Sequence, residues 1–298
     1  MVFTKLKIYN TKKPMKKYLF FLIIIFTSCT AGININTDDA EPRLIIFGTI
    51  SSDTTRHSVQ ITRSAGYFSN EEPPAITNAV VTISTENEVF TLLQDTVPGV
   101  YYTDSIAGKP YETYTLDVWL DFDNDGINEH YQAVSKMPEG PRVDSIYLSD
   151  YIIDKFPVLF LFGEVFINPE NENNLCIYTA KNNEKKGLFS YFQIFTPDMI
   201  IMIGDRYPLP FFAKGGIHVG DTVNFRVDNL SNDYARFLEQ AKSEMGVSMP
   251  FFSSPPAEVE SNIHCLNANI KVSGFFAAYD RGEDMTTIST INFDMPFN

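Results

Sequence analysis

The chain has 298 residues and a formal net charge of −14, from 37 acidic and 23 basic side chains. Nucleic acids and anionic lipid surfaces are bound through Lys and Arg, so this charge balance argues against nucleic acid as a partner. The length allows either one large β domain or two domains of ordinary size, and we expect two.

The first 28 residues have the charged, then apolar, then small order that is typical of a secretion signal. Lys16 and Lys17 precede the apolar stretch 18–26, which is shorter than the roughly 20 residues that span a membrane. The stretch leads to Cys29, where a bacterial lipoprotein signal is cut and the cysteine is lipid-modified. We therefore predict a signal peptide over residues 1–28 and a lipid anchor on Cys29. A transmembrane anchor or an ordinary cleaved signal is the alternative.

Removing residues 1–28, which hold six lysines and no acidic residue, takes the formal charge from −14 to −20. Such a surface suits cations, neutral glycans or peptides, and solubility alone also explains it. A start at Met15 would give a more typical signal, so residues 1–14 are not assigned. Residues 29–41 are small and polar without apolar periodicity, which predicts a flexible tether.

The segment 42–137 is predicted to form an immunoglobulin-like β-sandwich, because it contains short β-type runs separated by frequent turn signals. In the sixth run, Tyr114, Leu116, Val118 and Leu120 alternate with polar residues, which is the pattern of a half-buried strand. The seven predicted strands are 44–50, 58–63, 79–84, 89–93, 100–103, 114–120 and 127–135.

A boundary is predicted at the segment 137–141, where two prolines and a glycine interrupt the pattern. The second domain, 138–298, is again rich in strands but contains one helix, 234–245. Ser231 or Asn232 supplies its N-cap and Gly246 its end, and its apolar stripe predicts core packing. The strands expected here are 145–148, 158–167, 175–180, 190–195, 222–227 and 270–278.

An acidic segment between the sixth and seventh predicted strands has the pattern of the start of a calcium-binding loop. Asp121, Asp123 and Asp125 supply carboxylates at positions 1, 3 and 5, and Gly126 follows. Position 12 is Gln132, which cannot supply the bidentate carboxylate, but Glu129 at position 9 can complete a shorter loop. The alternative is a plain hairpin with Asp125-Gly126 in its turn. The predicted ligands of Ca²⁺ are therefore Asp121, Asp123, Asp125 and Glu129, with no other cofactor required.

Aromatic residues offer candidate contact sites for a ligand or a protein partner. Phe251 and Phe252 lie in a segment closed by two prolines, and Trp119 lies on the more polar face of its strand. Core packing is the alternative role for all three. Cys176 and Cys265 either form a disulfide or remain free thiols, since both are compatible with an extracytoplasmic compartment.

Hydrolytic chemistry requires a nucleophile with a base, or a metal with its ligands. The four histidines stand apart from one another in the sequence, and neither an HExxH nor a GxSxG motif occurs. We therefore expect no catalytic activity, although a hydrolase with dispersed catalytic residues remains an alternative.

The order of several short motifs resembles a Bacteroidota outer-membrane lipoprotein family catalogued as a domain of unknown function (DUF4249). The first domain also resembles the prealbumin-like sandwiches attached to outer-membrane receptors, through residues 79–83 and 99–101. The segment 121–130 is longer and more acidic than is usual in the family, so the resemblance implies no role for it. The motifs that carry the family resemblance are Met137-Pro138, 144–146, 220–223, the helix 234–245, 251–256, 261–263 and 274–276.

The resemblance implies a place and a partner, since members of this family are often encoded beside TonB-dependent receptors. We expect an outer-membrane protein anchored through Cys29, on the periplasmic face or the cell surface, that works as a non-catalytic accessory of such a receptor. An independent glycan- or peptide-binding lipoprotein is the main alternative.

Overall fold

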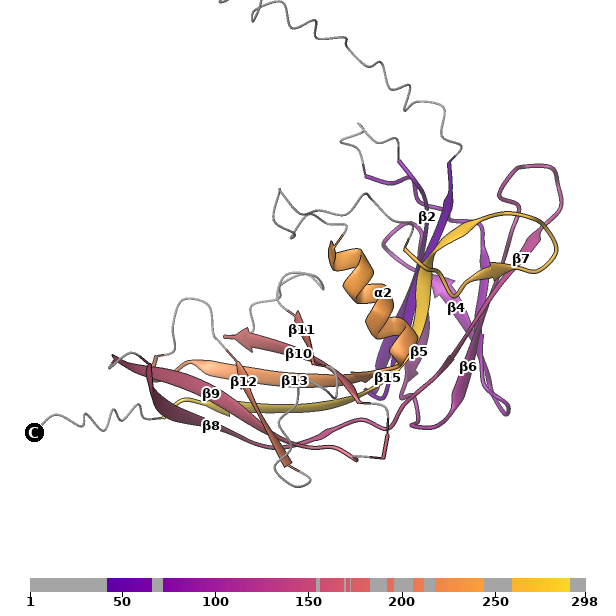
Figure 1. The fold of residues 1–298 in the computed structure, drawn as a ribbon. Helices are drawn as coiled ribbons and strands as arrows, with labels where there is room; N and C mark the ends of the chain where they lie inside the picture. The colour runs from indigo at the N-terminus through magenta and orange to yellow at the C-terminus, as the bar shows by residue number, and fades with distance from the viewer. Residues whose placement is uncertain are drawn as a thin grey trace, which may run out of the picture. The chain divides into compact units, whose positions relative to one another are not determined.

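The computed structural model describes residues 42–65, 72–153, 156–168, 170–171, 173–182, 192–195, 206–211, 218–243 and 259–289. Within these residues the protein is mostly β with a single α-helix, as predicted (Figure 1). The strands are β1 (Leu44–Ser51), β2 (Thr55–Arg63), β3 (Val80–Ser84), β4 (Val89–Gln94), β5 (Val100–Ile106), β6 (Thr113–Leu120), β7 (Glu129–Lys136), β8 (Arg142–Ile153), β9 (Phe156–Phe166), β10 (Asn174–Lys181), β11 (Phe192–Phe195), β12 (Arg206–Phe211), β13 (Thr222–Leu230), β14 (His264–Cys265) and β15 (Val272–Thr287), and the helix is α2 (Asn232–Lys242).

The strand β15 joins the two ends of the described chain. Its first half pairs in parallel with β1, from Leu44 opposite Val272 to Ser51 opposite Tyr279. Its second half pairs antiparallel with β13, from Asn229 opposite Asp280 to Thr222 opposite Thr287. The pairing produces, in the described residues, a twelve-stranded sheet in the order β11-β10-β13-β15-β1-β2-β5-β4-β3-β6-β7-β14.

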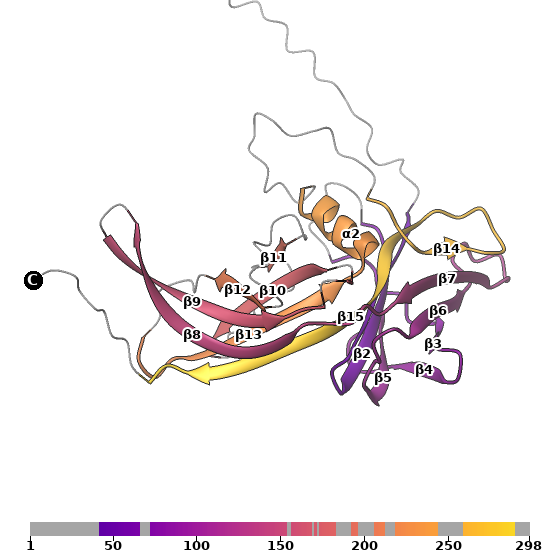
Figure 2. The same ribbon diagram turned by 60° about the horizontal axis from the view of Figure 1, so that its bottom comes forward.

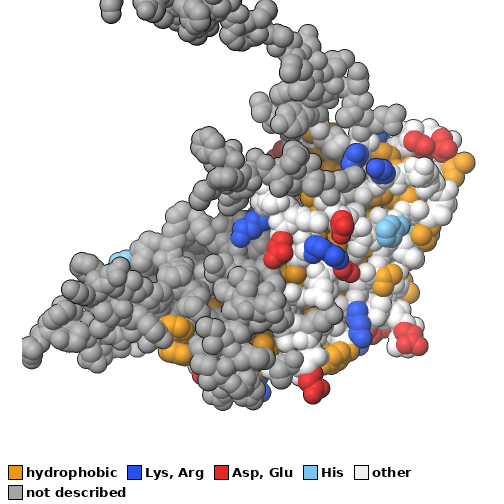
Figure 3. Space-filling view, in the orientation of Figure 1, with side chains coloured by type: hydrophobic (Ala, Val, Ile, Leu, Met, Phe, Trp, Pro, Cys, Tyr) orange, Lys and Arg blue, Asp and Glu red, His pale blue; other side chains and the backbone are white. Residues whose placement is uncertain are grey.

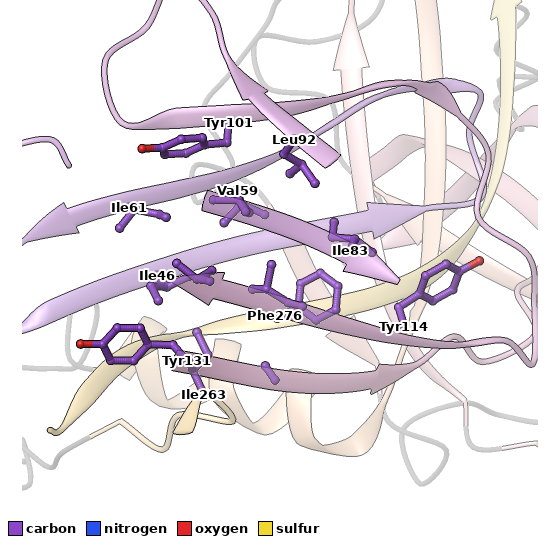
Figure 4. Close-up of a cluster of buried hydrophobic side chains, with 14 of the residues drawn as sticks. Ile46, Val59, Ile61, Ile83, Leu92, Tyr101, Tyr114, Tyr131, Ile263 and Phe276 are labelled. Carbon is purple, nitrogen blue, oxygen red and sulfur yellow. The ribbon is translucent and has the colours of Figure 1, made fainter. Parts of the chain in front are cut away.

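The first core fills the sandwich made by β1 to β7. Alternate residues of β1 and β2, such as Ile46 and Val59, are fully buried, and so are Ile83 and Leu116 on the facing strands. Figure 4 shows Ile46, Val59 and Ile83 pointing toward one another between the strands. Phe276 of β15 is buried in the same cluster, so the sandwich is completed from the far end of the chain.

The predicted domain boundary at residues 137 and 138 lies between β7 and β8. Two segments from beyond it nevertheless pair with strands of the sandwich. β14 pairs with β7, and the first half of β15 pairs with β1. The domain ranges 42–137 and 138–298 stay a prediction, and the strand pairing crosses them.

A second core lies where β8 and β9 pack against β10, β13 and β15 (Figure 2). Val165 of β9, Leu175 of β10 and Phe225 of β13 are fully buried in it. β9 also pairs with β8 and β12 in a separate three-stranded sheet. Burial of these aliphatic and aromatic side chains supplies the main stabilisation of this part.

The helix α2 packs its buried residues Tyr234, Ala235 and Leu238 against β10, β13 and β15, forming a third cluster. Ser231 is the N-cap, and its hydroxyl oxygen accepts the backbone N–H of Tyr234. The predicted N-cap and core packing are confirmed. The helix runs to Lys242 with Ser243 as its C-cap, and the predicted end at Met245 and Gly246 lies outside the described residues.

The sequence pattern missed β12 and β14, and it ended the last strand too early. Pro208 and Pro210 interrupt the pattern of β12, yet this strand lies at the edge of its sheet, where proline is tolerated. β14 has only two residues. β15 continues past Ala278 because its charged residues find partners, above all Arg281, which donates to Asp228 of β13.

Cys176 and Cys265 are free thiols, so the disulfide alternative is not what the structure contains. They pack against different clusters, since Cys176 belongs to the cluster around α2 and Cys265 packs against the sandwich core. Burial raises the pKa of the Cys176 thiol to about 12. A thiol in this state is a packing residue and a poor nucleophile.

Candidate functional site

The acidic segment forms the connection between β6 and β7. The last pair of the hairpin is Leu120 opposite Glu129, so residues 121–128 make a longer loop than the tight Asp125-Gly126 turn that the sequence also allowed. Asn124 and Gly126 have φ angles of 62° and 88°, in the left-handed region that Asn and Gly adopt most readily. Both positions therefore suit the bends that the loop makes between the paired strands.

The loop brings the four predicted ligands together. One carboxylate oxygen from each of Asp121, Asp123, Asp125 and Glu129 lies within 4.8 Å of the others. Ca²⁺ binds oxygen at about 2.3–2.6 Å, so ligands on opposite sides of one ion are roughly 5 Å apart. Mg²⁺ requires about 2.0–2.1 Å and an octahedral shell, which is tighter than this spread. The spread of the four oxygens is of the size that ligands of one Ca²⁺ ion have.

Backbone amides hold the aspartates in place. Asp121 accepts the N–H of Asp125 on Oδ1 at 3.1 Å and the N–H of Gly126 on Oδ2 at 3.0 Å. Asp125 in turn accepts the N–H of Ile127 at 2.7 Å. These bonds orient the carboxylates before any cation arrives, which reduces the ordering that binding would require.

Glu129 is the ligand that the tertiary structure positions most firmly. Its side chain is 4 % exposed, and its Oε2 accepts the N–H of Phe122 at 2.8 Å and the hydroxyl of Tyr131 at 3.4 Å. Burial, followed by the charge of Glu129, raises the pKa of Tyr131 above its usual range. Gln132, at position 12 of the longer calcium-loop pattern, instead donates to Asp117 at 2.8 Å. The shorter loop ending at Glu129 is thus the arrangement that the fold provides.

Nearby positive charge does not neutralise these acids. The Arg63 guanidinium donates to the backbone carbonyl of Phe122 and lies 4.2 Å from the centroid of its ring. Within the described residues, none of the four carboxylates forms an ion pair with Lys or Arg. Four acids so close together repel one another, and a divalent cation relieves that repulsion.

Trp119 lies on the outer face of the same sheet, opposite the core. Its ring stacks on His130 with centroids 4.6 Å apart, and His130 Nε2 lies 2.7 Å from Asp117 Oδ1. Val80 and Val134 are 56 % and 53 % exposed on this face. We call this surface, made by Val80, Trp119, His130 and Val134, the outer-sheet face. In Figure 3, hydrophobic and charged side chains are interspersed over the surface of the sandwich.

Cys29, Phe251 and Phe252 lie outside the described residues. No described helix is long and apolar enough to cross a membrane.

A pocket of about 450 Å³ lies near the end of β7, and the sequence pattern did not indicate it. Its lining comes from segments far apart in the chain, including Tyr111, Glu139, Asn171 and Phe275. Tyr111 has a φ of 67°, which is rare for a bulky residue. A backbone angle of this kind cannot be read from the sequence. The pocket was therefore accessible only from the tertiary structure.

The comparisons with known proteins give a family and no activity. None of the curated proteins matches this chain. A family model matches residues 31–284, a range that contains the acidic loop, the outer-sheet face and the pocket but not Cys29. The chain therefore belongs to the family described as a domain of unknown function, DUF4249.

Proposed function

We propose that this protein is a lipid-anchored, non-catalytic accessory protein of the outer membrane that works with a TonB-dependent receptor. The observation that carries the proposal is the family match, which begins at residue 31, two residues after Cys29, and continues to residue 284. A lipid on Cys29 would place this family domain directly at a membrane surface. Two acyl signals are sufficient for stable anchoring.

The outer-sheet face is the contact surface that we propose for the receptor. Trp119 presents an aromatic ring whose orientation is held by stacking on His130, and exposed Val80 and Val134 lie on the same face. Held aromatic side chains with apolar neighbours are typical of residues that dominate the energy of protein interfaces. Phe251 and Phe252 remain proposed as a second contact.

We expect a TonB-dependent receptor to co-purify in stoichiometric amount with the lipidated protein from gently solubilised outer membranes. Trp119→Ala is expected to weaken the association by about 2 kcal/mol, or roughly thirtyfold, if Trp119 is a central contact. Tyr147→Ala is the control, because Tyr147 is a 42 % exposed aromatic residue on β8, away from this face. Mass spectrometry identifies and quantifies the partner. Recovery of the protein alone would contradict the accessory role.

We also propose that the loop between β6 and β7 binds one Ca²⁺ through Asp121, Asp123, Asp125 and Glu129. The ion would supply positive charge that holds the four carboxylates together and stiffens the end of the hairpin. The support is their convergence within 4.8 Å. The role that we propose for the ion is therefore structural and not catalytic.

Calcium is expected to raise the melting temperature, because a ligand that binds only the folded state stabilises it. At one hundred times the dissociation constant the gain is about 2.7 kcal/mol. Asp123→Asn and Glu129→Gln are expected to reduce both the calorimetric heat and this gain. Asp104→Asn, at an exposed position of β5, is the matched control. Absence of heat and of any thermal shift at millimolar Ca²⁺ in the unsubstituted protein would refute the site.

A further inference from the structure

The pocket near the end of β7 is separate from the calcium loop, which lies at the opposite end of that strand. Its volume is about 450 Å³. This lies within the range of about 300–1,000 Å³ that is usual for small-molecule sites. One wall is formed by the end of β7 and the following residues Met137, Pro138 and Glu139, and another by Ser231 and Asp233 at the start of α2.

The floor of the pocket is preformed. Met137, Phe275 and Ser135 are almost completely buried. Asn262 holds the neighbouring strand, since it accepts the N–H of Phe276 at 2.9 Å and donates to the carbonyl of the same residue at 2.8 Å. Ser135 accepts the N–H of Ala278 at 2.9 Å. A ligand would therefore meet a floor whose polar groups are already fixed.

The rim carries a network centred on the Glu139 carboxylate. Its Oε2 accepts hydrogen bonds from the hydroxyl of Tyr111 at 2.6 Å, Nδ2 of Asn171 at 2.9 Å and Nδ2 of Asn168 at 3.2 Å. These bonds, led by that from Tyr111, hold the pKa of Glu139 below its usual value. The network directs Nδ2 of both Asn168 and Asn171 toward Glu139.

Tyr111 is presented to solvent at a conformational cost. Its side chain is 53 % exposed, and its φ of 67° lies in a region that bulky residues seldom adopt. The N–H of Tyr111 donates to the carbonyl of Met137 at 2.8 Å, and the phenol is tied to Glu139, so the ring is held at the mouth of the pocket. Strained residues that the surroundings hold in place are concentrated at binding sites.

The charges around the pocket offset one another. Lys136 and Glu139 carry opposite charges, and Asp233 is paired with Arg236 of the same helix. A strongly charged ligand would meet a like charge on one side or the other. Neutral ligands that both donate and accept hydrogen bonds match the amide, hydroxyl and carboxylate groups of the rim.

We infer that this pocket binds a neutral sugar of about disaccharide size, with one sugar ring against Tyr111 and its hydroxyl groups on Glu139 and Asn171. An aromatic ring offers an apolar face for the C–H groups of a sugar, and the amide and carboxylate satisfy its hydroxyls. A peptide is less suited to this place. A peptide that binds by adding a strand to the edge of a sheet needs a run of unpaired backbone groups there. β14 already pairs with β7 at Tyr131 and Gln132, which leaves only residues 133–136 at the end of β7.

The test uses the full chain in a detergent without a sugar headgroup. Saturation-transfer NMR and calorimetry are run with maltose, cellobiose, mannobiose, xylobiose and chitobiose. We expect at least one of them to bind with a dissociation constant below about 1 mM. Tyr111→Ala and Asn171→Ala are each expected to weaken it at least tenfold. Tyr147→Ala, which removes an exposed tyrosine outside the pocket, should leave it unchanged.

Three results would overturn the assignment. The first is the absence of binding by all five sugars. The second is sugar binding that both pocket variants retain while their melting temperatures remain normal. Binding of tripeptides that both pocket variants abolish, with no binding of any of the five sugars, would assign the pocket to peptides instead. Receptor association is measured separately in membranes, so failure of the sugar site and failure of the accessory role are distinguishable.

Discussion

Gly274→Ala is expected to lower the free energy of unfolding by about 3–5 kcal/mol, among the largest effects of any single substitution. Gly274 has a φ of 110°, which residues with a side chain rarely adopt. A Cβ atom there would also overlap the backbone carbonyl of Ile46, its partner in the parallel pair of β1 and β15. Only a separation of β1 and β15 would relieve this overlap. Chemical denaturation followed by circular dichroism measures the loss.

Gly220→Ala is the matched control for this prediction. Gly220 also has a positive φ, of 91°, but within the described part of the chain no heavy atom lies within 4 Å of a Cβ built on it. The unfavourable backbone conformation is then the only cost of the substitution. We expect the free energy of unfolding to fall by about 1 kcal/mol. Equal losses for the two variants would show that the close approach of β1 and β15 contributes little.

Asp228→Asn is expected to lower the free energy of unfolding by about 3 kcal/mol or more, because it breaks a buried ion pair. Asp228 is 1 % exposed, and its carboxylate accepts Nε of Arg281 at 2.6 Å and Nη2 at 3.0 Å. Nε of Arg226 lies 3.7 Å away, is buried and has no hydrogen-bond partner of its own. The substitution leaves both guanidinium groups without this countercharge. Arg281 keeps its contact with Asp53, which limits the loss.

An exposed ion pair supplies the comparison. Arg56 Nη1 and Asp95 Oδ2 are 2.7 Å apart, but their side chains are 50 % and 42 % exposed. Solvent screens such pairs, so Asp95→Asn should leave the denaturant midpoint almost unchanged. Denaturant midpoints of the two variants, measured in the same buffer, test the difference. If Asp228→Asn were as mild as Asp95→Asn, the buried pair would not be a major source of stability.

The Asp228–Arg281 pair also explains why β15 was predicted too short. Arg281, Glu283 and Asp284 interrupt the apolar pattern, and the expected strand therefore ended at Ala278. In the folded protein these residues pair with β13, where Arg281 finds Asp228 and Glu283 accepts from Asn224. A charge in a strand is acceptable when a cross-strand partner exists. That partner lies some 50 residues earlier in the chain and is invisible to a local pattern.

The candidate calcium loop was more accessible from sequence than the pocket was. Its ligands lie within nine consecutive residues, so spacing alone brings Asp121, Asp123 and Asp125 close together, and the left-handed positions fall on Asn124 and Gly126. The contribution of Glu129 depended on the hairpin register, which sets it opposite Leu120 and buries it. The residues that line the pocket come from the segment after β7, from the loop that contains Asn171, from the start of α2 and from β15. No local motif connects these segments.

The sequence by itself determined most of the strands, though not β12 or β14, and the residue that caps α2. Alternation of apolar and polar residues selects the buried face of each strand, as in Tyr114 to Leu120, and Ser231 caps the helix through local hydrogen bonding. Only the tertiary structure decided that β1 pairs with β15, that Arg281 lies against Asp228, and that Tyr111 meets Glu139. The physical reason is that periodicity reports which face of an element is buried. The choice of partner depends on packing between segments distant in the chain, to which a local pattern is blind.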